Sequence, residues 1–153
     1  MGADEGLLRL AADLAVDYAT GIDVRAATPS AAAVDALGAF DEELTAAGRP
    51  AEDTLRMLAE VGGPATMGST GPRYFGFVNG ATLPVALGAS FLVGAWDQNT
   101  ALPVMSPVAA ALHDVVRRWL VELLGLPAGT DVGFVTGATV ANAGALAAAR
   151  DAL

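Results

Sequence analysis

The sequence contains no cysteine. This absence excludes disulfide bonds, catalysis by a thiolate and metal sites built on cysteine, and we expect no metal to be bound. It also fits a reducing compartment, so we expect the protein in the cytoplasm. The acidic first residues, MGADEGLLRL, lack the basic segment that opens a secretory signal, so no such signal is predicted.

Lysine is also absent, and the basic side chains are eight arginines. A phosphate-binding loop of the Walker A type requires a lysine, so that motif is excluded. The acidic residues outnumber the basic ones and give a formal charge of −9. Nucleic acids and anionic membranes bind basic surfaces, so this charge argues against both as partners.

A long run without charge extends over residues 74–96, and its hydropathy is that of a membrane span. The run contains four glycines and Pro84, however, and it ends in Asp97-Gln98-Asn99 without a basic flank. We therefore interpret it as a loop followed by a buried helix over about 83–95, and we expect no membrane span.

Apolar residues recur at helical spacing in most of the remaining chain. Ser106 is a plausible N-cap for the clearest of these helices, Pro107 suits its first position and Gly125 its left-handed C-terminal residue. The segment 132–135 is typical of a short buried strand. The other predicted helices cover about 3–19, 30–47, 51–61 and 139–152.

The segment GFVTGATVANAGALAAAR, residues 133–150, carries the most chemical information. A strand that turns through Gly137 into a helix directs free backbone N–H groups and the positive end of the helix dipole at the turn, which favours an anion. An ordinary capped turn has the same pattern. The dinucleotide-binding fingerprint does not fit, because Gly137 and Gly144 lack its spacing.

Three blocks in this order resemble the group II pyridoxal-phosphate decarboxylases, which include glutamate and aromatic-amino-acid decarboxylases. The first block is GPRYFGFVNGATLP at 71–84, and the second is SPVAAALHDVVRRWLVELLGLP at 106–127. The third is the segment 133–150, similar to the family's phosphate loop and the helix after it. With the N-terminal helices, the resemblance covers nearly the whole chain.

The resemblance implies that pyridoxal phosphate is the cofactor and that the loop at Gly137, Ala138 and Thr139 binds its phosphate. The Ala138 backbone and the Thr139 hydroxyl and backbone are the leading contacts. Asn142 matches the same motif, either as a contact or as a residue that fixes the helix against the loop.

The resemblance also implies a substrate pocket for an amino acid. Phe77 corresponds to an aromatic residue of that pocket, often reaching across a dimer, although simple core packing is an equal alternative. Asn79, Pro84 and Asn99 are expected to shape the same pocket.

The implied architecture is α/β, mostly helical in this chain. Residues 1–75 would form an N-terminal helical arm for dimerisation. Residues 76–153 would begin the cofactor-binding large domain of a fold type I enzyme. In this family the Schiff-base lysine, a pyridinium-binding aspartate and a stacking histidine all follow the phosphate loop, so none is expected here. We expect the chain alone to be inactive and to need a complementary chain with the lysine, a second copy of itself, or both.

The sequence departs from the family at two places. Gly71 stands where many members have histidine, and His113-Asp114 stands where the family often has Leu-Glu. His113 is therefore expected to be a surface or interface residue.

Two other interpretations stay open. The chain could be a non-catalytic dimerisation or interaction module derived from that family, or an unrelated helical protein that binds phosphate or a nucleotide. Under the decarboxylase interpretation, apolar faces meant for an absent sheet would be exposed and the isolated chain would aggregate.

Overall fold

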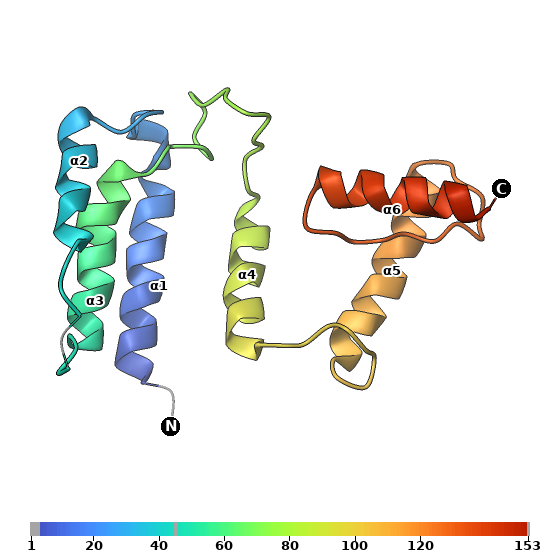
Figure 1. Cartoon of the computed structure of the whole chain (residues 1–153), viewed down its shortest axis with the longest axis horizontal. Coiled ribbons are helices and arrows are strands. Elements are labelled where there is room, and N and C mark those ends of the chain that lie inside the picture. The colour runs from blue at the N-terminus through green and yellow to red at the C-terminus, as the bar shows by residue number, and fades with distance from the viewer. Residues whose placement is uncertain (1–3, 45, 153) are drawn as a thin grey trace. The chain divides into compact units, whose positions relative to one another are not determined.

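The computed structural model describes residues 4–44 and 46–152, and the regular secondary structure in these ranges is helical (Figure 1). The chain divides into two compact units, Met1–Gly88 and Ala89–Leu153. The α-helices are α1 (Glu5–Thr20), α2 (Ala31–Asp35), α3 (Ala51–Met57), α4 (Pro84–Trp96), α5 (Pro107–Leu123) and α6 (Ala138–Asp151). The helical content predicted from the sequence is thereby confirmed.

The first unit is built on α1, α2 and α3, with α3 between the other two (Figure 1). Helix α1 begins where the Asp4 carboxylate accepts a hydrogen bond of 3.0 Å from the Leu7 backbone N–H, a normal N-cap. Helix α3 continues as a turn of π-helix, Leu58–Gly62. The predicted helices at 3–19 and 51–61 are therefore confirmed.

The second predicted helix is shorter than expected. Ser30 caps it, with Oγ accepting from the Ala33 N–H at 3.2 Å, but α2 gives way to a 3-10 segment, Ala36–Phe40. Gly38 lies in that segment, and glycine lowers helix propensity by about 1 kcal/mol relative to alanine. The predicted continuation to Gly48 is wrong.

A polar network joins α1 to the end of the α3 region. The Tyr18 hydroxyl is 2.7 Å from Thr66 Oγ1, and Thr66 Oγ1 donates to the Gly63 carbonyl at 2.8 Å. The Arg25 guanidinium lies 4.4 Å from the centroid of the Tyr18 ring and also donates to the Gly63 carbonyl. These contacts tie together segments that are distant in the sequence.

In the second unit, α5 begins and ends at the predicted residues, although Ser106 makes no side-chain cap bond. Pro107 occupies its first position and Gly125 follows it with φ 63°. The Gly125 N–H donates to the Glu122 carbonyl at 3.1 Å, and the Leu126 N–H donates to the Val121 carbonyl at 2.9 Å. This pair of bonds is a Schellman motif, in which glycine is preferred because the left-handed conformation crowds a Cβ.

The strand predicted at 132–135 is not formed in the part of the chain that the structure describes. The segment before α6 is irregular and has no ladder partner. A strand is defined by hydrogen bonds to another strand, and no second strand occurs in the described residues. The local pattern suited a strand, but the pairing it requires is not supplied.

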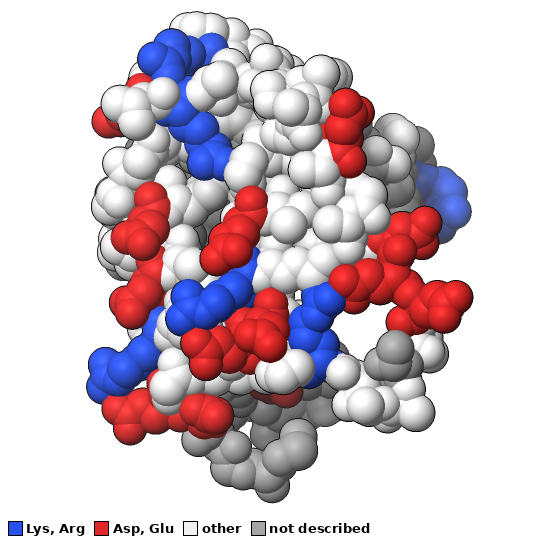
Figure 2. Space-filling view, turned by 90° about the vertical axis from the view of Figure 1, so that its left-hand side faces the viewer, with Lys and Arg blue, Asp and Glu red and all other residues white. Residues whose placement is uncertain are grey.

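Little of the described chain is buried. Ser106, Val121 and Gly68 are the buried residues among those described. The helix predicted over about 83–95 forms as α4, but the expected burial is not found, because Leu87 is half-buried and the rest of α4 is exposed. Charged side chains of both signs are interspersed over one face (Figure 2), with exposed pairs such as Arg9–Glu5 and Arg56–Glu52. No helix within 4–44 or 46–152 is both long and apolar enough to cross a membrane.

Candidate functional site

The expected phosphate loop lies at the start of α6, in the second unit. Gly137 precedes the helix in a fully extended conformation, and its carbonyl accepts from the Ala141 N–H at 3.1 Å. Among the described residues, the N–H groups of Ala138, Thr139 and Val140 have no hydrogen-bond partner, and no side chain caps the helix. Three free donors at the positive end of a helix form a suitable place for an anion.

The side chains around this turn are open to ligand. Thr139 and Asn142 are both exposed, and their spacing of three places them on one face of α6. The first turn of α6 carries no acidic residue that would repel an anion. The predicted cofactor-binding residues therefore lie at the N-terminal end of α6: Gly137, Ala138, Thr139 and Asn142.

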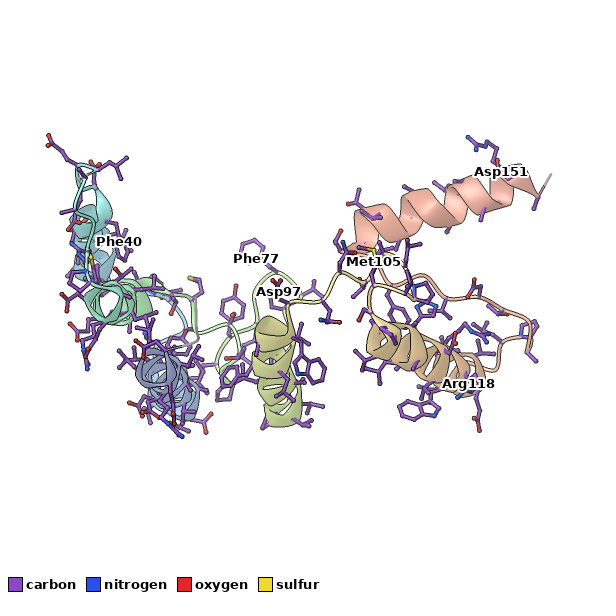
Figure 3. All side chains as sticks on the ribbon, turned by 90° about the horizontal axis from the view of Figure 1, so that it is seen from below. Phe40, Phe77, Asp97, Met105, Arg118 and Asp151 are labelled. Atoms are coloured by element: carbon purple, nitrogen blue, oxygen red, sulfur yellow. The ribbon has the colours of Figure 1, made fainter. Side chains whose placement is uncertain are left out.

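Phe77 lies in the loop before α4 (Figure 3) and is 89% exposed. It is the first central residue of a turn closed by the Asn79 N–H and the Gly76 carbonyl at 3.2 Å. Phe77 and the β-branched Val78 both have positive φ, 54° and 57°, which is costly for residues with a Cβ. Of the two roles predicted for Phe77, core packing does not occur in this unit.

The other pocket residues occupy separate positions. Asn79 is exposed in the loop after this turn, and Pro84 is the first residue of α4. Asn99 follows α4, and its Oδ1 accepts from the Ala101 N–H at 3.0 Å. Asn99 belongs to the second unit, whereas Phe77, Asn79 and Pro84 belong to the first. The cavities described below are lined by other residues.

A cavity of about 780 Å³ in the second unit was not predicted from the sequence. His113 lines it and meets the Phe134 ring edge-on, with centroids 5.2 Å apart. Ser106 also lines it and is 1% exposed, and its hydroxyl has no hydrogen-bond partner among the described residues. Ser106 thus makes no cap bond to α5, although the sequence suggested one. The one possible sequence signal for this cavity was a contact between His113 and an aromatic residue. Nothing in the sequence indicates that Phe134 lies beside His113.

A second cavity, of about 500 Å³, lies in the first unit between α1 and the α3 region. Tyr18 and Arg25 line it, and both are already engaged in the polar network described above. Nearby on α3, the hydrogen bond from Arg56 to Glu52 raises the pKa of Arg56 above its ordinary value, but both side chains are at the surface. Because Tyr18 and Arg25 are already bonded within the protein, we assign the cavity between α1 and the α3 region a structural role.

Within the described residues, no three histidine, aspartate or glutamate side chains gather closely enough to hold a metal ion. Comparison with models of known protein families found none that matches the chain. Comparison with solved structures found no significant match. The resemblance to the decarboxylases therefore depends on the three sequence blocks alone, and the function stays a proposal.

Proposed function

We propose that this chain is the N-terminal part of a pyridoxal-phosphate-dependent amino-acid decarboxylase, a carboxy-lyase of fold type I. The single observation that supports this most is the turn into α6, where the backbone N–H groups of Ala138, Thr139 and Val140 are free. The sequence resemblance assigns the cofactor phosphate to Gly137, Ala138 and Thr139, at the same end of this helix. The free donors are thus compatible with the phosphate site that the sequence resemblance implies.

The residues present fit one end of the cofactor. The three N–H groups and the Thr139 hydroxyl would hold the phosphate as donors, and Asn142 lies on the same face of α6. Phe77, Asn79, Pro84 and Asn99 would contribute to the wall of the amino-acid pocket in the complete enzyme.

The other end of the cofactor needs groups that this chain lacks. Bound pyridoxal phosphate supplies an electron sink for the bond that breaks, and a lysine must hold its aldehyde. The chain contains no lysine. The active enzyme therefore requires a polypeptide region that carries this lysine, and a second copy of the chain is a further expected partner.

Pyridoxine phosphate tests the phosphate site without the aldehyde chemistry, because a hydroxymethyl group replaces the aldehyde. We expect it to shift the backbone amide resonances of Ala138, Thr139 and Val140. Pyridoxine without phosphate is the matched control and should leave them unchanged. Thr139→Val should weaken the binding, since it removes the hydroxyl but keeps the shape. If the phosphate compound moves no resonance at the start of α6, the cofactor assignment is wrong.

A non-catalytic interaction module is the second candidate, and the exposure of α4 favours it. Leu83, Val85 and Leu92 are all more than half exposed on or beside this helix, which carries no charge. One absorbance measurement distinguishes the two candidates. In it the chain is mixed with pyridoxal phosphate and with the polypeptide region that carries the lysine. A visible absorption band that borohydride removes indicates the enzyme. Tight association without the band indicates the module.

A further inference from the structure

We infer that Asn79 is a site of spontaneous deamidation, in which the backbone nitrogen of Gly80 attacks the side-chain amide. The inference does not depend on the proposed function. Asparagine is among the chemically labile residues. The chain contains three asparagines, Asn79, Asn99 and Asn142, and only Asn79 is followed by glycine.

The reaction balances with water as the only co-reactant. The Gly80 nitrogen bonds to Cγ of Asn79, and the Cγ–Nδ2 bond breaks. Ammonia leaves with the proton that the Gly80 nitrogen gives up, and a cyclic imide remains. Water then opens the imide at either carbonyl and produces an aspartyl or an isoaspartyl residue at position 79.

The surroundings of Asn79 leave this attack unobstructed. Asn79 and Gly80 are both exposed and belong to no helix. The Gly80 N–H has no hydrogen-bond partner among the described residues, and a Cβ added at Gly80 would meet nothing within 4 Å. The nucleophile, the amide and the space for ring closure are thus all available.

The other two asparagines are held in ways that oppose the reaction. Asn99 Oδ1 accepts from the Ala101 N–H, and the β-branched Thr100 follows it. Asn142 lies inside α6, where the helical backbone keeps the nitrogen of Ala143 away from Cγ. They provide internal controls in the same molecule.

Deamidation would change the character of this segment. It adds a negative charge to residues 74–96, a run that otherwise carries none. The charged form resists burial in an apolar interface, because an unpaired charge loses its hydration there. Any partner that buries the run should therefore both exclude the product and protect Asn79 from reaction.

The test is peptide mapping by mass spectrometry after incubation of the purified chain at neutral and mildly alkaline pH. We expect the mass gain of an NH2-to-OH exchange at Asn79 and not at Asn99 or Asn142, with isoaspartate present. The rate should rise with pH, since the attacking nitrogen must lose its proton. The same chain in urea should react at Asn79 at a similar rate.

Two variants and two outcomes complete the design. Gly80→Ala should slow the reaction strongly, because a Cβ crowds the attacking nitrogen, and Asn79→Gln should abolish it. Absence of the mass gain at Asn79 would overturn the inference. A native rate far below the rate in urea would equally overturn it, because the loop would then be shielded. The comparison in urea uses the unchanged polypeptide, so it stays decisive if a variant fails to fold.

Discussion

Two serines precede helices in this chain, and their hydroxyl groups differ in their bonding. Ser30 Oγ caps α2 by accepting from the Ala33 N–H. Ser106 precedes α5 at the same relative position, yet its buried hydroxyl bonds to nothing in the described residues. The Ser106 backbone is satisfied, because its N–H donates to the Leu102 carbonyl and its carbonyl accepts from the Ala110 N–H. Only the Ser106 hydroxyl is buried without a hydrogen bond to the described residues.

Replacing Ser106 with alanine therefore tests the structure against the sequence pattern. A buried hydroxyl without a partner costs about 1–3 kcal/mol, so Ser106→Ala should raise the free energy of unfolding by about 1 kcal/mol or more. A functioning N-cap would give the opposite sign, a loss of about 1 kcal/mol. Urea denaturation followed by circular dichroism measures the difference.

Ser30→Ala is the matched control for this experiment. Because its hydroxyl does cap a helix, we expect a loss of about 1 kcal/mol. If both variants lose stability equally, Ser106 is a cap in solution and its hydroxyl is not without a partner.

At the scale of elements, the sequence predicted helices well because their determinants are local. Capping residues, apolar spacing and the glycine after α5 all lie within the segments they control. The strand at 132–135 failed for the opposite reason, since its hydrogen bonds depend on a partner elsewhere. The site behaves in the same way. The start of α6 at Gly137 and Ala138 depends on local residues, whereas a pocket made of Phe77, Asn79, Pro84 and Asn99 requires tertiary contacts.

The end of α5 gives a prediction at this scale. Gly125 has φ 63°, and an L-residue with a Cβ pays about 1–2 kcal/mol in that conformation. Gly125→Ala should therefore lower the free energy of unfolding of the second unit by about 1 kcal/mol, measured by urea denaturation.

Gly129→Ala is the control for the end of α5. It lies four residues further along the same connection, has no positive φ, and a Cβ there meets nothing within 4 Å. We expect it to be neutral or slightly stabilising. Equal losses at both positions would show that the connection tolerates no side chain at all, and that the positive φ of Gly125 is not the cause of the loss.

The whole molecule exposes more surface than its size explains. Its accessible area is 11,943 Å². Two separate globular bodies with the lengths of the two units would expose about 8,600 Å² by the usual scaling. The surplus exceeds the roughly 1,200–2,000 Å² that a standard protein interface buries. Helix α4 contributes to it, since it is apolar on all sides and all of it except Leu87 is exposed. A helix of this kind is normally enclosed in a core.

We therefore expect the isolated chain to associate through α4. Light scattering coupled to size-exclusion chromatography should show oligomers or aggregates. Leu92→Glu should reduce them, because a charge on this uncharged helix opposes burial. Leu8→Glu is the matched control, as Leu8 is similarly exposed, at 60% against 53%, but lies among charged residues on α1. A monodisperse wild-type monomer with cooperative unfolding would contradict this prediction. It would also weaken the proposal that the chain is part of a larger enzyme, since that proposal expects the isolated chain to expose apolar faces and aggregate.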